Sequence, residues 1–375
     1  MEREGFSRAI TLSVRALNRA LLARQMLLRR ERSSVADALD RLVGMQAQVP
    51  NAPYVGLWSR VVGFRPEQLV DLILARRAVR TALMRNTLHL VSADDCLMLR
   101  PVVQRLLARA YGKADPVKLA AMVAAGRAIL EEQPRTNVEL GRLMQKQFPG
   151  YEATTLGYAV RDHAALVQVP PRGLWGQSCA ATVTTAESWL GRQLSSSSDP
   201  GEMILRYLRA FGPASAGDIA AWSGLGRLKE AVDRLRPRLA TFRDENGREL
   251  LDVLNGLRPR ATVAAPIRFL PEYDNVLVAY ADRSRIIPDE HRARVIRELG
   301  RPALLVDGFV RGTWKIVRES RRVVLDIELL DRSARPWQSA IDAEGMKLLA
   351  FMEPDAVKRR IGRVCVRVST GARRL

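Results

Sequence analysis

One order of predicted elements recurs along the first two thirds of the chain and limits the folds that it can adopt. In the first copy, apolar residues at helical spacing follow Ser13, Ser33-Ser34 can cap a second helix, and Pro66-Glu67 opens a third. The helices are expected over about 13–30, 33–46 and 66–76, and two short strands over 81–84 and 87–91. Three helices followed by a hairpin is the order of a winged helix.

The same order appears twice more. In residues 93–194, helices are expected at 93–111, 116–132, 136–148 and 153–165, followed by a strand at 166–169. Ser92 can cap the first of these helices, and a capping box at Thr136 and Glu139 opens the third. After a polar linker at 195–198, the third copy has helices at 201–211, 215–223 and 225–235 and strands at 239–243 and 249–254. Asn246-Gly247 joins these strands, because this pair accepts the positive φ of a hairpin turn.

From about residue 262 the pattern changes. Strands are expected at 267–270, 276–280, 304–306, 313–317, 323–327 and 363–368, and a helix at 337–352. We therefore expect an α+β protein in which tandem winged-helix motifs are followed by a C-terminal mixed α/β domain. The expected units are 1–92, 93–194, 199–256 and 262–375.

Residues 307–312, Asp-Gly-Phe-Val-Arg-Gly, are expected to form a turn within the last unit. In a probing hairpin, Phe309 and Arg311 could enter a groove or fill the gap left by an extruded base. The alternative is an ordinary surface loop with Phe309 turned inward.

The charge of the chain indicates a polyanionic partner. Lys and Arg number 60 against 40 Asp and Glu, which gives a formal net charge of +20. Only seven of the basic residues are lysine. Codon bias would explain arginine in place of lysine, but not the excess of basic over acidic residues. Because arginine suits bidentate phosphate contacts, a nucleic acid is the expected partner.

Several functional classes are disfavoured. The few cysteines and histidines stand far apart: Cys96, Cys179, Cys365, His89, His163 and His291. They form no CxxC or HExxH pattern, and no Walker phosphate loop is present, so we expect neither a metal nor another cofactor. No stretch approaches the roughly 20 apolar residues of a membrane helix, and the start of the chain lacks the order of a signal peptide. We expect a cytoplasmic monomer without membrane contact.

Gln46-Ala47-Gln48 has the most distinctive chemistry. It lies where the second predicted helix gives way to Val49-Pro50, and a residue before proline is driven into extended conformation. In extended chain, side chains two apart point to the same side, so the two carboxamides can address one point and hold a water there. The alternative is helix-end capping and solvent contact.

Five groups of residues, in this order, resemble the AlkZ-type winged-helix DNA glycosylases, relatives of bacterial YcaQ. They are GMQAQ at 44–48, RNTLHL at 85–90, AWSGL at 221–225, LPEYDN at 270–275 with Asp282-Arg283, and VDG at 306–308 with GTWK at 312–315. The resemblance covers nearly the whole chain. It implies winged helices around a basic concave surface that holds duplex DNA, and metal-free hydrolysis of the N-glycosidic bond of alkylated purines.

The resemblance also implies site residues. The two glutamines of the family's Gln-x-Gln motif are catalytic, which implies this role for Gln46 and Gln48. Glutamine rather than aspartate at position 48 resembles the AlkZ-like branch. Some members of that branch protect antibiotic producers from their own DNA-alkylating products.

The chemistry of amides limits the substrate. A carboxamide does not ionise near neutral pH, so it cannot act as a strong general base. It can accept and donate hydrogen bonds, and thereby position a water and ease positive charge on the sugar. A guanine alkylated at N7 or an adenine alkylated at N3 is already cationic and leaves readily. We therefore expect action on cationic N-alkylpurines, with bulky adducts or interstrand crosslinks as further candidates, and little action on neutral lesions.

Other residues are assigned to DNA from their place in wings, helices and turns. They are Arg85, Asn86, Thr87, His89, Arg227, Lys229, Phe309, Arg311 and Lys315. His89 is equally compatible with a structural, hydrogen-bonded role. Asp274 could support positive charge on the sugar, or it could order a turn or pair with an arginine. A phosphate contact is favoured for Lys315 over a Schiff base, so the enzyme is expected to be monofunctional.

Two readings without catalysis compete with the enzyme. A transcriptional regulator built of several winged helices accounts for charge and fold, but not for Gln-Ala-Gln. An architectural DNA-bending protein is the third hypothesis. Release of a base from alkylated DNA separates the enzyme from both.

Overall fold

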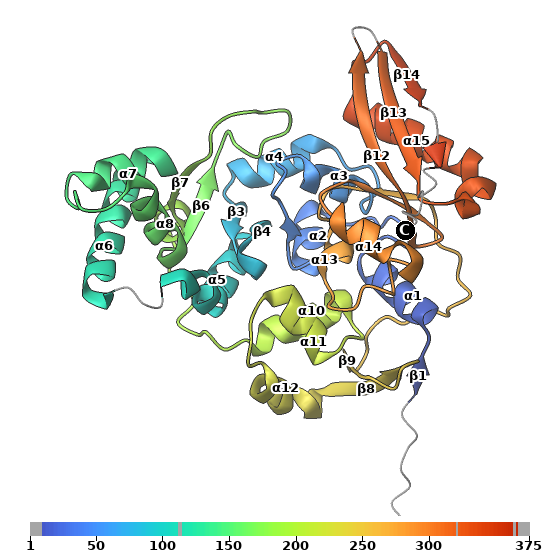
Figure 1. Ribbon diagram of the computed structural model, residues 1–375, viewed down its shortest axis with the longest axis horizontal. Helices are drawn as coiled ribbons and strands as arrows, with labels where there is room; N and C mark the ends of the chain where they lie inside the picture. Colours follow the sequence, from blue (N-terminus) through green and yellow to red (C-terminus); the bar gives the residue numbers. More distant parts are fainter. Residues whose placement is uncertain (1–9, 112–114, 320–321, 363–364, 367–375) are drawn as a thin grey trace, which may run out of the picture.

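The computed structural model describes residues 10–111, 115–319, 322–362 and 365–366, and it is a mixed α and β structure, which confirms the α+β class. Its helices are α1 (Val14–Arg24), α2 (Val35–Arg41), α3 (Ala52–Trp58), α4 (Pro66–Leu74), α5 (Ala93–Leu107), α6 (Pro116–Glu132), α7 (Asn137–Gln145), α8 (Ala153–His163), α9 (Ala186–Leu190), α10 (Gly201–Phe211), α11 (Ala216–Ser223), α12 (Lys229–Leu235), α13 (Asn275–Val278), α14 (Asp289–Arg297) and α15 (Gln338–Met352). Figure 1 shows α6–α8 as a lobe on one side, α10–α12 below the centre and α15 at the opposite upper side.

The first sheet joins strands from the first two expected units. Its order is β2 (Met45–Gln46), β4 (Leu88–Ser92), β3 (Ala78–Ala82), β6 (Leu166–Val169), β7 (Thr182–Thr185) and β5 (Arg135–Thr136). Neighbouring strands run antiparallel, and β3 pairs with β6. The expected boundary at residue 92 therefore runs through one continuous sheet, and the division into four units stays a prediction. Because β2 is an edge strand, the glutamines lie at the border of this sheet.

Two further sheets complete the fold. The first consists of β1 (Thr11–Leu12), β8 (Leu239–Asp244) and β9 (Glu249–Val253), with β1 parallel to β8. The C-terminal sheet consists of β10 (Arg268–Leu270), β11 (Ala303–Val306), β12 (Phe309–Glu319), β13 (Arg322–Leu329), β14 (Lys358–Ile361) and β15 (Cys365–Val366). α15 packs on it through buried Ile341 and Leu348, which belong to the same core as Phe269 and Leu325.

Local signals start the helices, and apolar stripes hold them together. Ser34 Oγ accepts a hydrogen bond from Asp37 N at 3.1 Å and thereby caps α2. Such a cap contributes about 1 kcal/mol. The largest core joins α1, β3, α5 and α10, and buries Leu21, Val79 and Leu99. This shared core fixes the first sheet relative to α10–α12.

Three local predictions are wrong. The second helix ends at Arg41 instead of near residue 46, and Met45–Gln46 is a strand. Residues 276–280, expected as a strand, begin with α13, because the Asp274 side chain caps it by accepting from Val276 N at 3.2 Å. Short buried apolar runs do not distinguish helix from strand. The expected turn at 307–312 is limited to Asp307-Gly308, because β12 begins at Phe309.

Some predictions fall partly on residues outside the described ranges. Of the expected strand at 363–368, the structure describes β15 alone, and the start of the chain up to residue 9 lies outside as well. Throughout the described ranges, each helix is too short or too polar to cross a lipid bilayer.

Candidate active site

The stretch before Gln46 turns sharply so that the chain can pass from α2 into the edge strand. Val43 and Gly44 have φ of 54° and 76°, and Gly44 N donates to Leu39 O at 2.9 Å, as in a helix terminator of the Schellman type. A Cβ on Gly44 would lie 2.8 Å from the Leu90 carbonyl oxygen and 2.3 Å from a Val91 methyl carbon. Glycine is therefore required here for both backbone conformation and space.

The C-terminal part of the chain holds this turn in place. Asn275 Nδ2 donates to the carbonyl oxygen of Gly44 at 2.8 Å and to that of Leu42 at 3.4 Å. The preceding Asp274 forms a two-bonded ion pair with Arg60, with both N–O distances 2.8 Å and both side chains fully buried. This corrects the suggestion that Asp274 supports catalysis, because its oxygens are enclosed and neutralised by Arg60.

Gln46 is buried and its carbonyl oxygen is engaged. It is paired with His89 across β2 and β4, and 8% of its surface is exposed. Arg85 Nη2 donates to Gln46 Oε1 at 2.8 Å, while Arg85 Nη1 donates to the Trp222 carbonyl at 2.6 Å. The fold therefore brings Gln46, the turn of the first wing and the end of α11 into contact.

Gln48 lies further along the same extended stretch and is exposed. Its Oε1 accepts a hydrogen bond from Leu88 N at 3.3 Å, and Ala47 N donates to Leu88 O at 2.7 Å. Both glutamine side chains thus turn toward residues 85–88. That the two amides address one point, as expected for residues two apart in extended chain, stays a prediction.

The turn that carries Arg85 fits tightly against α11. Arg85 and Asn86 have φ of 56° and 54°, a conformation that is uncommon for residues other than glycine. Gly224, which ends α11 with φ of 79°, packs so closely that a Cβ would lie 3.0 Å from Arg85 Cα. Two of the motifs that carry the family resemblance therefore meet here.

Burial shapes the electrostatics around Gln46. Burial, followed by the charge of nearby Arg283, lowers the pKa of Arg85 to about 10, so Arg85 stays charged at neutral pH. Burial, followed by the charge of Arg85, lowers the pKa of His89 to about 3. His89 is 2% exposed and its Nδ1 donates to the Thr87 carbonyl at 2.9 Å. The enclosed neutral ring corrects the assignment of His89 to DNA, because its side chain has no surface with which to contact a ligand.

Sequence reasoning missed Arg80, in β3. Its Nη2 donates to the Ala47 carbonyl at 2.6 Å, between the two glutamines, and its side chain is buried. Its Nε and Nη1 atoms are buried without a hydrogen-bond partner, and burial, followed by the charge of Arg172, lowers its pKa to about 10. The signal that could have found Arg80 is a charged residue in the middle of an otherwise apolar strand.

The remaining predicted DNA contacts are spread over the surface. Asn86, Arg227 and Lys229 are exposed and Thr87 is half-buried. Lys229 also pairs with Asp233 at 2.6 Å on its own helix. The Thr87 hydroxyl donates to the Met84 carbonyl at 3.1 Å. The other three side chains are exposed to solvent.

The C-terminal candidates are more constrained. Half-buried Arg311 pairs with both Glu290 and Asp331 at 3.3 Å, and exposed Lys315 lies 3.9 Å from Asp326. Phe309 is half-buried at the start of β12. None of these contacts reaches the glutamines.

One cluster of possible metal ligands occurs among the described residues. It contains Glu290, His291 and Asp331, whose ligand atoms lie within 4.8 Å of one another. Arg311 donates to both carboxylates of the cluster, at 3.3 Å each. The guanidinium already supplies positive charge there, so the group does not fit a cation.

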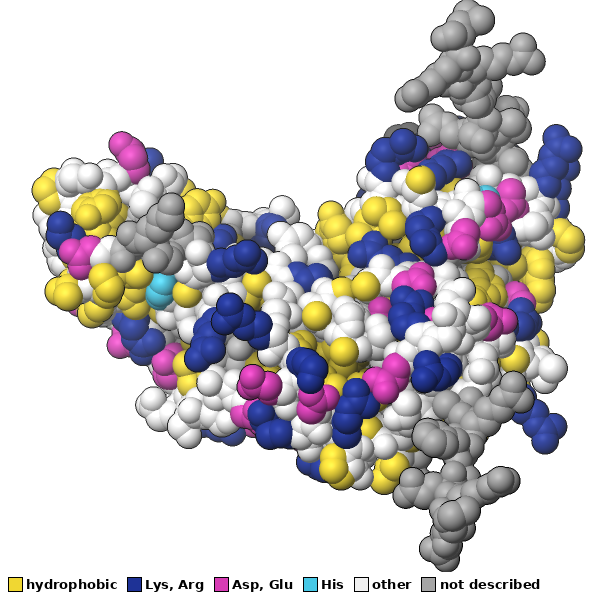
Figure 2. Space-filling model, turned by 60° about the horizontal axis from the view of Figure 1, so that its bottom comes forward, with side chains coloured by type: hydrophobic (Ala, Val, Ile, Leu, Met, Phe, Trp, Pro, Cys, Tyr) yellow, Lys and Arg dark blue, Asp and Glu magenta, His cyan; other side chains and the backbone are white. Residues whose placement is uncertain are grey.

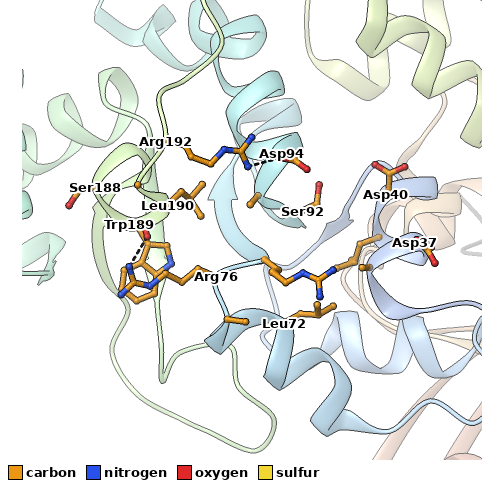
Figure 3. A pocket seen from close by; sticks show the side chains of 16 residues that line it. Asp37, Asp40, Leu72, Arg76, Ser92, Asp94, Ser188, Trp189, Leu190 and Arg192 are labelled. Carbon is orange, nitrogen blue, oxygen red and sulfur yellow. Dashed lines mark hydrogen bonds and ion pairs between the residues drawn. The ribbon is translucent and has the colours of Figure 1, made fainter.

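A wide pocket of about 630 Å³ lies between α2, α4, the start of α5 and α9 (Figure 3). Its arginines are engaged, since Arg76 stacks 4.1 Å over the Trp189 ring and Arg192 pairs with Asp94 at 2.6 Å. Neither glutamine lines it. Ser92, in its wall, lies about 10 Å along β4 from the partner of Gln46. The pocket is therefore separate from the glutamine site.

The molecule also has a broad hollow. Figure 2 shows it between the lobe of α6–α8 and the mass that carries the C-terminal sheet, with Lys and Arg side chains along and below it, interspersed with acidic ones.

Comparisons with known proteins address the family. A family model described as "DNA glycosylase AlkZ-like" matches residues 39–351. A curated relative from Streptomyces sahachiroi, named "Interstrand DNA cross-link repair glycosylase", is 26% identical over an alignment of 329 residues. The match covers 79% of this chain and 86% of the relative. The solved structure of the Streptomyces sahachiroi DNA glycosylase AlkZ shares the fold, with a TM-score of 0.76 and 22% identity over 96% of this chain and all of that one. The chain therefore belongs to the AlkZ-like DNA glycosylase family.

Proposed function

We propose that this protein is a monofunctional DNA glycosylase that hydrolyses the N-glycosidic bond of cationic alkylated purines, namely N7-alkylguanine and N3-alkyladenine. The observation that supports this most is that Gln46, at the end of the edge strand β2, and Gln48 both hydrogen-bond to the segment 85–88, which carries Arg85. The name of the Streptomyces sahachiroi relative adds bulky adducts and interstrand crosslinks to the candidate substrates.

The two amides position a water for this reaction. An amide can donate through its N–H groups and accept through its carbonyl oxygen, so the two glutamines together can hold a water. The water oxygen bonds to C1′ of the sugar as the bond from C1′ to the base nitrogen breaks. The electron pair of that bond neutralises the cationic base, and the excess proton of the water passes to solvent. Positioning of this kind lowers the barrier without a titrating base.

The neutral state of His89 restricts the substrate. His89 is the ionisable ring nearest to Gln46 in the sheet, and its pKa of about 3 leaves it neutral at physiological pH. A neutral purine needs protonation before it can leave, whereas a cationic alkylpurine does not. The site therefore favours lesions that already carry positive charge.

Duplex DNA is the proposed partner, held by tandem winged-helix motifs over the concave face. The helix–helix–helix–hairpin order of α10, α11, α12, β8 and β9 supports this, as does the hollow in Figure 2. Asn86, Arg227 and Lys229 are proposed contacts, because they are exposed, and half-buried Thr87 is proposed with them because it adjoins Asn86 in the same turn. The protein is expected to act as a monomer.

Base release tests the proposal directly. The protein is incubated with duplexes containing one N7-methylguanine or one hypoxanthine, a neutral purine lesion, and abasic sites are then cleaved with alkali. We expect cleavage at N7-methylguanine and little at hypoxanthine. Gln46→Ala and Gln48→Ala should lose activity, while Gln193→Ala, an exposed glutamine, serves as the matched control. A wild-type protein that binds the duplex but releases no base would favour a DNA-binding regulator instead.

A further inference from the structure

Arg85 uses both terminal nitrogens of its guanidinium on groups far apart in the sequence. Nη2 donates to Gln46 Oε1 at 2.8 Å and Nη1 to the Trp222 carbonyl at 2.6 Å. Trp222 lies in the last turn of α11, where helix carbonyls lack an intrahelical partner and favour a cation. Because the guanidinium is planar and its donors are fixed in direction, the two bonds together determine how Gln46 is turned.

These bonds also decide which end of the Gln46 carboxamide faces the protein. A guanidinium can only donate, so the atom toward Arg85 is the carbonyl oxygen. The amino group points the other way. Among the described residues Gln46 Nε2 has no hydrogen-bond partner, and it is not fully enclosed by the protein. Its N–H groups are therefore open to a small bound molecule.

Gln48 is held much less firmly than Gln46. Its Oε1 accepts from Leu88 N at 3.3 Å, a long contact, and its side chain is exposed. Turning the Gln48 amide costs one weak hydrogen bond. Turning Gln46 would instead place an amino group against the guanidinium of Arg85. One amide of the pair is therefore fixed, and the other is free to rotate.

We propose that Arg85 is a positioning residue that fixes Gln46 as a hydrogen-bond donor to the reacting water and leaves Gln48 free to accept a hydrogen bond from it. This division of roles rests on the proposed glycosylase function. An N–H of Gln46 takes one lone pair of the water, and the carbonyl of Gln48 takes one of its hydrogens. The second lone pair of the water remains available for C1′.

The first test exchanges donors for acceptors. Gln46→Glu keeps the shape of the side chain and an oxygen for Arg85, but removes the N–H groups. Its single-turnover rate of base release from N7-methylguanine duplex should fall about 10- to 100-fold. Gln48→Glu keeps an acceptor oxygen, so its rate should fall less than that of Gln46→Glu. Gln193→Glu, at an exposed glutamine outside the site, is the control and should stay within about threefold of the wild type. A Gln46→Glu protein that retains the wild-type rate would overturn the proposal.

The second test separates positioning from phosphate binding. Arg85→Lys keeps the charge but cannot bridge two carbonyl oxygens with a rigid fork. We expect the rate at saturating protein to fall about tenfold or more, with the Kd for undamaged duplex within about twofold of the wild type. Arg209→Lys, at an exposed arginine that pairs with Glu202, is the matched control. An unchanged rate together with weaker binding and a salt slope smaller by about 0.9 would make Arg85 a phosphate contact instead.

A third measurement does not depend on catalysis. In protein labelled with ¹⁵N-glutamine, the side-chain amide of Gln46 should be rigid and that of Gln48 mobile, and Arg85→Lys should release Gln46 alone. Equal mobility of the two amides in the wild type would overturn the inference. If the wild type released no base while Gln46 were rigid, the proposed function would fail but the positioning by Arg85 would stand.

Discussion

Two turns between neighbouring strands both contain residues with positive φ, but their contacts with the rest of the molecule differ. The Arg85 turn, residues 83–87 between β3 and β4, sends a guanidinium to Gln46 and to the end of α11. The Asp307 turn, Asp307-Gly308 between β11 and β12, is fastened to α1. Asp307 pairs with Arg15 at 2.7 Å and with Arg19, and Asn18 Nδ2 donates to Gly308 O at 2.8 Å.

The sign of the charge within each turn explains the difference. Both turns contain a residue other than glycine with positive φ, 56° at Arg85 and 46° at Asp307. Asp307 neutralises the arginines that face it, so the turn becomes a fastening between distant parts of the chain. Among the described residues, Arg85 donates its hydrogen bonds to carbonyl oxygens and forms no ion pair, so its positive charge remains beside the glutamines. A turn with an uncompensated arginine is the better candidate for a site that binds DNA.

The largest contrast is expected for base release by Gln46→Ala and Phe309→Ala. Gln46 lies in contact with the Arg85 turn, and loss of one fixed polar group in an active site costs about 10²- to 10³-fold in rate. Phe309 follows the Asp307 turn, so its loss should leave the single-turnover rate within about threefold. A comparably slow Phe309→Ala protein would show that both turns serve the reaction.

Stability should show the reverse contrast. Asp307→Asn removes the charge that compensates Arg19, whose side chain is fully buried. We expect a loss of about 2 kcal/mol in the free energy of unfolding, because hydrogen bonds to charged groups are worth about 1.5–3 kcal/mol. Urea denaturation measures this loss. The folded variant should release N7-methylguanine at the wild-type rate, and a slow rate would place the Asp307 turn in the active site.

Two glycines with positive φ test how closely the Arg85 turn fits α11. Gly224 has φ of 79° and packs on Arg85, whereas Gly247 has φ of 76° and nothing within 4 Å of an added Cβ. Alanine at either position should cost about 1 kcal/mol through backbone conformation. Gly224→Ala should additionally displace Arg85 and slow base release, while Gly247→Ala should not. Equal rates for both variants would show that the contact with α11 does not position Arg85.

Acid sensitivity gives the smallest expected effect. Burial, followed by Arg85, lowers the pKa of His89 to about 3, below the value of about 6.5 in an unfolded chain. The unfolded state therefore binds a proton first as the pH falls. The stabilising contribution of neutral His89 is complete above about pH 6.5 and declines below it, at about 1 kcal/mol per pH unit.

The measurement compares urea denaturation at pH 6 and pH 5. His89→Gln should flatten the dependence on pH, whereas Asp307→Asn should leave it unchanged in this range. Burial opposes the charged form of the Asp307 carboxyl, but the hydrogen bond from Arg15 stabilises it, and the pKa of Asp307 is lowered overall. Asp307 therefore titrates only at more acidic pH. An equally steep dependence in His89→Gln would contradict the assignment to His89.

Elements with local signals could be predicted closely from the sequence. The expected helix at 116–132 matches α6, the expected helix at 201–211 matches α10, and the expected strand at 166–169 matches β6. Caps, turn residues and apolar periodicity act over a few residues, so they can be recognised in the sequence. The helix α13 was missed, because its buried apolar residues fit either kind of element.

Only part of the site could be predicted from the sequence, because only some of its features depend on neighbouring residues in the chain. Two glutamines separated by one residue in extended chain share a side whatever surrounds them. The Asp274–Arg60 ion pair, the hydrogen bond from Arg80 to the Ala47 carbonyl and the pairing of β3 with β6 depend on partners that the sequence pattern does not name. Each joins residues brought together by the packing of whole elements.

The sequence by itself determined the order of the elements, the excess of positive charge and the presence of two paired amides that cannot titrate. The tertiary structure alone decided which end of Gln46 faces outward. That choice depends on Arg85 and Trp222, which are 137 positions apart and meet only because the Arg85 turn packs against the end of α11. A hydrogen bond has direction, and its direction is set by the position of both partners rather than by the identity of either one.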